Sequence, residues 1–242
     1  MRLILLTGMR GRVGFELSKA FEAIGFEVRP MNHNLNYSKY QLPSCSELSQ
    51  YENVIVVHSG QPNAPRKRAD RIRYISATRD LIEESHINSF RFIFVSSLSA
   101  HESNRSNYSR DKQCLEELTI ANSGSVVKLG IVSGLKNGHD LKIEKMQKMF
   151  TFFRLSFLLS SSTIYFTNLN SLKNIALDLN RLDFYEGYRV YVDTEFHPAT
   201  ELSVFELSLK RLIVNALSLL SKVGSGKADV LLSLMDGMRK PN

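Results

Sequence analysis

Residues 2–14 read RLILLTGMRGRVG, an apolar run that leads directly into a turn containing three glycines. A short run of Leu and Ile that ends at a glycine is typical of a buried β-strand. Helical periodicity of apolar residues follows over residues 13–24. A strand, a glycine-rich turn and the start of a helix together offer unpaired backbone N–H groups and the positive end of a helix dipole to an anion. The stretch therefore predicts a phosphate-binding turn at the start of an α/β fold.

The glycines of this turn have distinct predicted roles. Gly8 permits the tight turn, Gly11 lets the backbone approach a pyrophosphate, and Gly14 lets the helix pack closely on the strand. Three glycines alone are a weak signal, and a turn without a ligand is the alternative, but the flanking strand and helix favour a nucleotide site. The predicted cofactor-binding residues of this segment are Thr7, Gly8, Arg10, Gly11, Arg12, Val13 and Gly14.

The cations around the turn bear on which dinucleotide binds. Arg10 and Arg12 lie at the start of the predicted helix, where positive charge opposes the dipole unless an anion is present. The second predicted strand ends at Asn32, where an Asp or Glu would bond ribose hydroxyls and favour NAD. Together with the nearby Arg29 and His33, these residues favour NADP, with NAD as the alternative. The other interpretation is that the arginines are solvated surface residues.

A second group of residues predicts proton transfer. Tyr108 and Lys112 are four residues apart on a predicted helix, so they share a face. A free tyrosine has a pKa of about 10, and a neighbouring ammonium lowers it by stabilising the phenolate. Tyr108 then serves as the general acid or base at a carbonyl or an alcohol. Ser97 ends the preceding predicted strand, at the sheet edge where ligands bind, and can bond the same oxygen. A surface tyrosine beside a solvated lysine is the alternative.

Short apolar runs alternate with helical segments through the first half of the chain. The predicted strands are residues 2–6, 26–31, 54–57, 91–95 and 125–129, and the predicted helices are 13–24, 66–85 and 108–122. Such alternation implies parallel strands with helices on both faces. We therefore expect a Rossmann-type doubly wound parallel sheet in residues 1–134. Residues 135–242 are predicted to form a small C-terminal substrate lobe whose helices pack back on the core, giving a single compact unit.

These motifs resemble those of the short-chain dehydrogenase/reductase superfamily. The motifs that carry the resemblance are Thr7-Gly8-x-x-Gly11-x-x-Gly14, VVHSG at 56–60, FIFVSS at 92–97, Tyr108-x-x-x-Lys112 with Glu116 four residues on, and VKLGIVSG at 127–134. They are most similar to the extended branch, which contains sugar-nucleotide epimerases, dehydratases and ketoreductases. The resemblance covers residues 1–134 well and the remainder poorly, so the chain looks like a short member.

The resemblance assigns further roles. It implies that Ser97 and Tyr108 contact the reacting oxygen and that Lys112 also holds the nicotinamide ribose. Ser59 and Gly60 are implied to lie along the cofactor. By the same resemblance, the helices at 66–85 and 108–122 pair in a homodimer interface.

Some positions depart from the family pattern. The separation of Ser97 and Tyr108 is 11 residues (108 − 97), which is shorter than is usual in the extended branch. The segment 96–99 reads SSLS and lacks the acidic residue of the dehydratases, which argues against dehydration. Tyr74 falls near a position where Asn is common. The short C-terminal part leaves the substrate open.

Bulk properties restrict the partners. The formal net charge of +7 favours anionic partners such as nucleotides or phosphorylated sugars, although many small domains are simply this basic. The two cysteines form no zinc pattern, and we expect no metal site. The basic residues form no stripe with interleaved aromatics, so nucleic acid is not expected. The apolar runs are too short for a signal peptide or a membrane span, which predicts a cytoplasmic protein.

Two hypotheses of different classes follow. The first is an NAD(P)-dependent oxidoreductase, either a ketoreductase or a 4-epimerase, acting on a nucleotide-activated sugar as its small-molecule substrate. The second is a non-catalytic dinucleotide-binding protein that senses redox state or assists an assembly. A complete Ser97, Tyr108 and Lys112 set favours the first, because a sensor needs no proton-transfer group.

Overall fold

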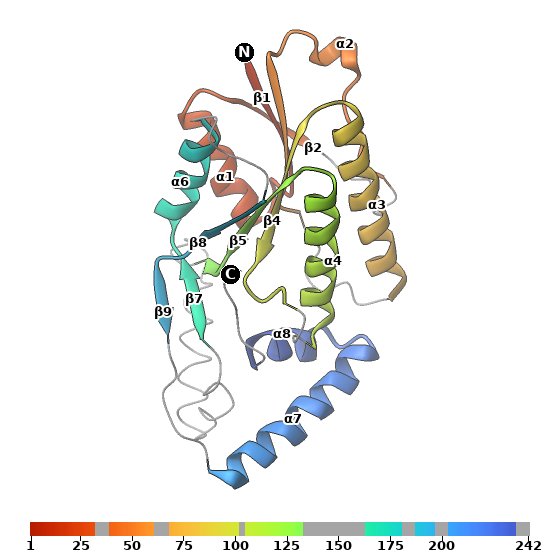
Figure 1. Cartoon of the computed structure of the whole chain (residues 1–242), viewed down its shortest axis with the longest axis vertical. Coiled ribbons are helices and arrows are strands. Elements are labelled where there is room, and N and C mark those ends of the chain that lie inside the picture. The colour runs from red at the N-terminus through yellow and green to blue at the C-terminus, as the bar shows by residue number, and fades with distance from the viewer. Residues whose placement is uncertain are drawn as a thin grey trace.

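The computed structural model describes residues 1–31, 39–60, 68–101, 105–132, 163–180, 187–196 and 203–235. Its centre is a sheet of six parallel strands in the order β2-β1-β3-β4-β5-β8 (Figure 1). These strands are β1 (Arg2–Thr7), β2 (Glu27–Met31), β3 (Asn53–His58), β4 (Arg91–Ser97), β5 (Ser125–Leu129) and β8 (Gly187–Tyr191). The helices beside the sheet are α1 (Arg12–Ala23), α3 (Arg68–Ile87), α4 (Asn107–Ala121) and α6 (Leu169–Asn180). The predicted Rossmann-type α/β fold with a parallel sheet is confirmed.

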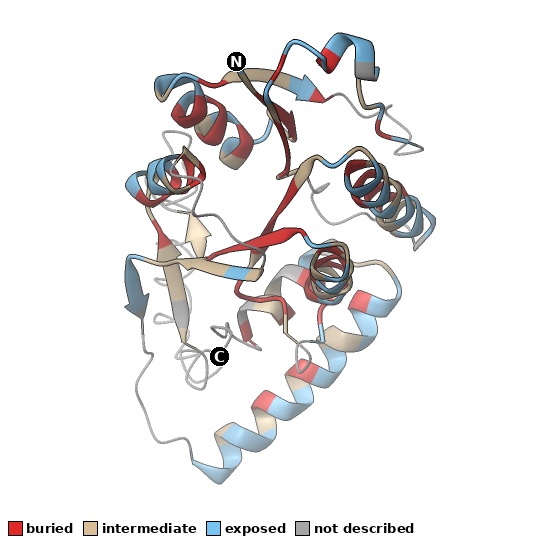
Figure 2. Ribbon diagram, turned by 45° about the horizontal axis from the view of Figure 1, so that its top comes forward, coloured by how far each residue is buried: buried red, intermediate tan, exposed pale blue. Residues whose placement is uncertain are grey.

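Smaller elements lie outside this sheet. A second sheet has the order β6-β7-β9, formed by β6 (Ile131–Val132), β7 (Ile164–Thr167) and β9 (Thr194–Phe196). The remaining helices are α2 (Cys45–Leu48), α7 (Val204–Lys222) and α8 (Gly226–Met235). Helix α8 packs against α4, and α7 packs against α8 with its outer side exposed (Figure 2).

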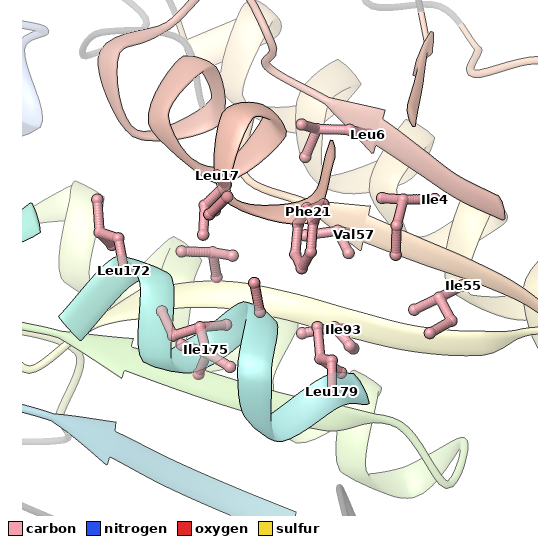
Figure 3. Close-up of a cluster of buried hydrophobic side chains, with 14 of the residues drawn as sticks. Ile4, Leu6, Leu17, Phe21, Ile55, Val57, Ile93, Leu172, Ile175 and Leu179 are labelled. Atoms are coloured by element: carbon pink, nitrogen blue, oxygen red, sulfur yellow. The ribbon is translucent and has the colours of Figure 1, made fainter. Parts of the chain in front are cut away.

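Helices cover both faces of the sheet because the buried strands are apolar on both faces. Along β1, Ile4 and Leu6 point to one face, and Leu3 and Leu5 point to the other. The first face packs against α1 and α6, as Figure 3 shows with Leu17, Phe21, Leu172, Ile175 and Leu179 around the strands. The second face packs against α3 and α4. Continuous apolar runs of this kind are expected for a parallel sheet that is covered on both sides.

The strand order places a ligand crevice at one end of the sheet. From β1 the chain passes to β2 on one side and then to β3 on the other, so the order reverses between β1 and β3. Ligands of such sheets bind beyond the carboxyl ends of the strands at this reversal. All six strands are parallel, so the residues that follow β1, β3 and β4 meet at the same edge.

The C-terminal part contributes to the sheet as well as to the smaller elements. Strand β8 pairs with β5, and α6 packs beside α1, although both come from the residues assigned to the lobe. The division at residue 134 thus leaves part of the sheet on its C-terminal side, and the lobe itself stays a prediction. The predicted strand end at Asn32 lies outside the described residues.

Candidate active site

The turn after β1 has the geometry that its glycines predict. Gly8 has a φ of +72°, a left-handed conformation that side chains rarely adopt. The Gly11 N–H donates to the Gly8 carbonyl over 2.7 Å and closes the turn. A Cβ added to Gly14 would lie 2.2 Å from that carbonyl oxygen, so the first turn of α1 rests directly on the turn. The predicted close packing of helix on strand is therefore present.

The beginning of α1 is arranged to receive an anion. Gly11 is the N-cap residue, no side chain caps the helix, and the first turn carries no acidic residue. The helix N-terminus therefore presents backbone N–H groups and a positive dipole end to the crevice. Arg10 and Arg12 are exposed beside it. These features fit the pyrophosphate of a dinucleotide.

Thr7, Ser59 and Gly60 hold the ends of β1 and β3 together. The Thr7 hydroxyl is buried, lies 2.8 Å from His58 Nδ1 and accepts the Gly60 N–H over 3.2 Å. Ser59 donates from Oγ to the Thr7 carbonyl over 2.8 Å. A Cβ on Gly8 would lie 2.5 Å from the Gly60 Cα. In this structure the hydroxyls of Thr7 and Ser59 are used to position the glycine turn.

His58 and Tyr74 form a buried pair behind this junction. Both side chains are fully buried, and the Tyr74 hydroxyl lies 3.2 Å from His58 Nε2. Burial raises the pKa of Tyr74 well above its ordinary value. Tyr74, which stands where the family often has Asn, is therefore a core residue.

One of the residues that favoured NADP is engaged elsewhere. Arg29 donates from Nε to Glu27 over 2.7 Å and from its guanidinium to the Tyr51 hydroxyl over 2.5 Å. These bonds join β2 to the segment before β3 and engage the Arg29 guanidinium. Of the four residues that favoured NADP by their charge, Arg10 and Arg12 are described beside the turn, and His33 lies outside the described residues.

Two of the predicted catalytic residues, Tyr108 and Lys112, lie on one face of α4. This face packs against the end of β4, which carries the third, Ser97. Three successive β4 residues each bond one of three α4 residues spaced four apart, an arrangement that we call the α4–β4 ladder. Its contacts are Lys112 Nζ donating to the Val95 carbonyl over 2.7 Å, the Ser96 hydroxyl donating to Glu116, and a hydrogen bond between the Ser97 and Tyr108 hydroxyls. The structure thus brings Ser97, Tyr108 and Lys112 together at the carboxyl edge of the sheet.

The pKa of Tyr108 is not lowered by Lys112, as the sequence predicted, but raised. Burial raises the pKa of Tyr108 to about 12, although the hydrogen bond from Ser97 acts in the opposite direction. Burial also lowers the pKa of Lys112 to about 7, against a smaller raising effect of Glu116. The Lys112 ammonium is directed to the Val95 carbonyl, so in this structure desolvation outweighs stabilisation of the phenolate. Tyr108 is therefore a neutral phenol, and a proton donor, at neutral pH.

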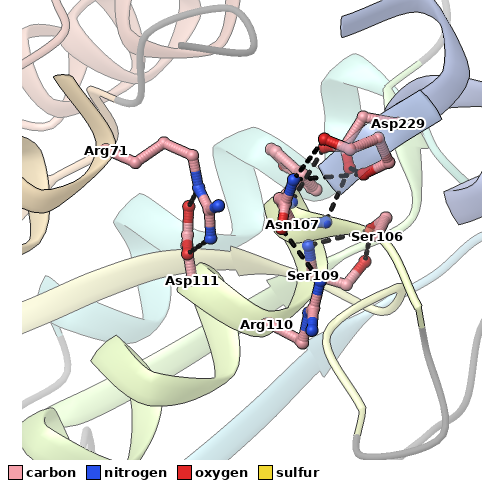
Figure 4. A network of polar contacts seen from close by, with 9 residues as sticks. Arg71, Ser106, Asn107, Ser109, Arg110, Asp111 and Asp229 are labelled. Atoms are coloured by element: carbon pink, nitrogen blue, oxygen red, sulfur yellow. Dashed lines mark hydrogen bonds and ion pairs between the residues drawn. The ribbon is translucent and has the colours of Figure 1, made fainter. Parts of the chain in front are cut away.

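Sequence reasoning missed the residue that caps the helix carrying Tyr108. Asp229 of α8 is buried and accepts the backbone N–H groups of Asn107 and Tyr108 over 2.6 and 2.9 Å (Figure 4). Ser106 caps the next N–H, that of Ser109, over 3.0 Å. The acid comes 121 residues after Tyr108, so no local pattern reveals it. The C-terminal helix thus fixes the start of α4.

A second buried acid fixes α4 against α3. Arg71 donates to both carboxylate oxygens of Asp111, over 2.8 and 2.5 Å, as Figure 4 shows. Such bidentate pairs hold a specific geometry. Helix α4 is therefore held in three ways: by Asp229 at its N-terminus, by Arg71 from α3, and by its packing on the sheet.

Replacing the capping acid tests this arrangement. We expect Asp229→Ala to lower the free energy of unfolding by about 2 kcal/mol, because two N–H groups of α4 lose their acceptor. Thermal unfolding measures the loss. Lys227→Ala changes an exposed residue of the same helix and serves as the control. Equal stability of the two variants would show that Asp229 does not hold α4.

Other classes of site are not indicated. Among the residues that the structure describes, no group of three or more His, Cys, Asp and Glu side chains is placed to hold a metal ion. Within those same ranges, no helix is long and apolar enough to cross a membrane.

Comparisons with known proteins agree with the geometry. No family model and no curated protein sequence matches the chain. A short-chain dehydrogenase/reductase superfamily protein from Agrobacterium tumefaciens with bound NAD is similar over 89% of this chain and 82% of its own, with 18% identity and a TM-score of 0.55. UDP-N-acetylglucosamine 4-epimerase from Bacillus cereus is similar over 90% and 86%, with 14% identity and a TM-score of 0.58.

A third similar structure is a reductase. The dTDP-4-dehydrorhamnose reductase from Yersinia enterocolitica is similar over 90% of this chain and 80% of its own, with 15% identity and a TM-score of 0.60. At sequence identities this low, the similarity shows a shared fold and does not show a shared function. The chain has the Rossmann-type α/β fold of the short-chain dehydrogenase/reductase superfamily proteins.

Proposed function

We propose that the chain is a nicotinamide-dinucleotide-dependent oxidoreductase of the short-chain dehydrogenase/reductase type that acts on a nucleotide-activated sugar. The observation that carries the proposal is the hydrogen bond between Tyr108 and Ser97 at the sheet edge that also bears the glycine turn. A proton donor and a dinucleotide site beside each other are what carbonyl reduction needs. The sugar-nucleotide substrate is supported by the names of the similar epimerase and reductase.

The residues divide the work as follows. The backbone of Gly11 and the first turn of α1 hold the pyrophosphate, and the resemblance assigns Lys112 to the nicotinamide ribose. A bound nicotinamide dinucleotide supplies the hydride. Tyr108 donates its phenolic proton to the oxygen of the reacting carbonyl, while the Ser97 hydroxyl bonds the same oxygen and orients it.

The protonated state of Tyr108 suits the reduction step that both candidate reactions contain. With its pKa raised to about 12 by burial, Tyr108 is ready to give a proton to a ketone. A 4-epimerase also oxidises an alcohol, and in that step the phenolate serves as the base. We therefore propose a ketoreductase or a 4-epimerase.

The proposed function is tested with nucleotide-activated sugars. We expect purified protein to oxidise NADPH or NADH when a nucleotide-activated 4-keto sugar is supplied. An epimerase would instead interconvert the two C4 epimers of a nucleotide sugar with no net change in the dinucleotide, which proton NMR follows. Tight dinucleotide binding without either reaction would favour the alternative, a non-catalytic redox sensor or assembly factor.

The preference for NADP is a separate proposal. We expect NADPH to bind more tightly than NADH, because exposed Arg10 and Arg12 supply positive charge for the additional phosphate. The double variant Arg10→Gln, Arg12→Gln is expected to weaken NADPH binding about tenfold and to change NADH binding little, as a charge-assisted phosphate contact is worth roughly 1.5 kcal/mol. Fluorescence titration of both dinucleotides measures this. Tighter binding of NADH by the unaltered protein would contradict the preference.

A homodimer through α3 and α4, and a cytoplasmic location, stay predictions. Among the described residues of these two helices, the exposed large apolar side chains are Ile72 and Ile87. Ile75, Leu118 and Ile120 of the same helices are only partly buried.

A further inference from the structure

One rung of the α4–β4 ladder has no role in the proposed reaction. Glu116 is only 2% exposed, yet its carboxylate carries two strong contacts. It accepts the Ser96 hydroxyl, and it forms an ion pair with Lys128 of β5, whose Nζ lies 2.8 Å away. A buried carboxylate is costly unless it is paired and hydrogen-bonded. A buried, fully paired carboxylate beside the proposed site therefore needs a physical explanation.

Lys128 extends the ladder to the loop that follows Ser97. Its Nζ also donates to the Ala100 carbonyl over 3.1 Å, and the Ala100 N–H donates to the Ser97 carbonyl over 2.9 Å. The Ser97 hydroxyl lies 3.0 Å from that of Ser99 in the same loop. Glu116 and Lys128 therefore connect α4 to the end of β4, where Ser97 lies, and to the loop that follows it.

Glu116 is also the acid nearest to Lys112 along the ladder. Lys112 is 4% exposed, and its Nζ lies 4.4 Å from the centre of the Phe94 ring, a weak substitute for water. The two side chains are one helical turn apart on the same face. Burial lowers the pKa of Lys112, and Glu116 is the group that raises it.

Other titratable groups surround this layer from every side. Tyr108 is on α4 itself, Lys128 is on β5, Tyr188 is on β8, Tyr74 is on α3, and His58 on β3 stacks on Phe94. Asp111, the remaining nearby acid of α4, is bound by Arg71 of α3. Within the described residues, Glu116 is thus the acid in this layer that can favour a protonated Lys112.

We propose that Glu116 is a positioning residue: fastened by Lys128 and Ser96, its carboxylate is the counter-charge one helical turn from Lys112 and holds Lys112 and Ser97 in register with Tyr108. The catalytic meaning of this role rests on the proposed function. The effect of Glu116 on Lys112 does not, and it can be measured on the protein without substrate or dinucleotide.

The measurement is the titration of Lys112 followed by NMR in protein labelled with [¹³Cε]lysine, with the resonance assigned through Lys112→Met. Glu116→Gln keeps the shape and can still accept the Ser96 hydroxyl, but it removes the charge. We expect the titration midpoint of Lys112 to fall by on the order of one pH unit, as is usual for loss of a neighbouring opposite charge. Glu117→Gln, which removes the exposed acid next along the helix, is expected to leave the midpoint unchanged.

A second variant guards against misfolding, because Glu116→Gln leaves Lys128 as a buried charge without its acid. The double variant Glu116→Gln, Lys128→Met removes both charges, a replacement that is often neutral for stability. We expect the Lys112 midpoint to fall in the double variant too, by less than in Glu116→Gln, because the opposing charge of Lys128 is removed as well. A midpoint equal to that of the unaltered protein in either folded variant would overturn the inference.

Turnover separates this inference from the proposed function. Where the protein turns over a keto sugar, the alkaline limb of its pH–rate profile is expected to move to lower pH in Glu116→Gln by the same amount as the midpoint. A shifted midpoint with no turnover in any protein would contradict the proposed function and support the effect on Lys112. Turnover with an unshifted midpoint would support the proposed function and contradict the effect of Glu116 on Lys112.

Discussion

Tyr108→Phe is expected to lower turnover of a keto-sugar substrate by about a thousandfold, the usual range for loss of a general acid. The substitution removes a single hydroxyl, which is the group that bonds Ser97 and is placed to protonate the reacting oxygen. In transition-state terms the loss corresponds to roughly 4 kcal/mol. Steady-state assays of dinucleotide oxidation measure it. The ring stays in place, so α4 and its caps are expected to be intact.

Binding and stability provide the controls for this variant. Dinucleotide affinity is expected to change less than about threefold, because the proposed pyrophosphate site is at the start of α1, away from Tyr108. Tyr51→Phe removes a buried hydroxyl that bonds Arg29 and Glu27 beside β2. That variant should lose some thermal stability and keep its turnover. Normal turnover in Tyr108→Phe would remove Tyr108 from the mechanism.

The fold was predictable because its signals are local. The apolar run of β1, the glycine spacing and the alternation of strands and helices each lie within a short window of sequence, and each reflects burial or backbone geometry. The four-residue spacing of Tyr108 and Lys112 likewise reports a shared helical face. Those features were sufficient to predict five of the six parallel strands and the residues that gather at their edge, whereas β8 lies in the part of the chain assigned to the lobe.

The remaining parts of the site depend on pairings that no local pattern encodes. Asp229 caps α4 from a helix near the other end of the chain, and Lys128 reaches Glu116 from the neighbouring strand. Arg29, read from the sequence as a candidate phosphate ligand, is bound by Glu27. The protonation of Tyr108 and Lys112 follows from how deeply each is buried. Burial and long-range partners are properties of the packed structure.

Gly14→Ala is expected to weaken dinucleotide binding at least about a hundredfold and to destabilise the fold. The added Cβ would lie 2.2 Å from the Gly8 carbonyl oxygen and 2.8 Å from Ser59 Oγ. Neither neighbour can yield easily, because Gly8 is itself packed against the Gly60 backbone and Ser59 Oγ is bonded to Thr7. The first turn of α1 therefore has to move away from the strand, and the N–H groups aimed at the pyrophosphate move with it.

The matched control for this variant is Gly25→Ala, at the other end of α1. Gly25 has a φ of +88° and open space around its Cβ position, so alanine there adds backbone strain without a clash. We expect that variant to lose about 1 kcal/mol of stability and to bind the dinucleotide normally. Calorimetric titration of NADPH and NADH, with thermal unfolding of the same samples, distinguishes the two effects. If Gly14→Ala bound both dinucleotides as tightly as Gly25→Ala does, the turn after β1 would not be the dinucleotide site. In that case Gly14 would serve only the close packing of α1 on the turn.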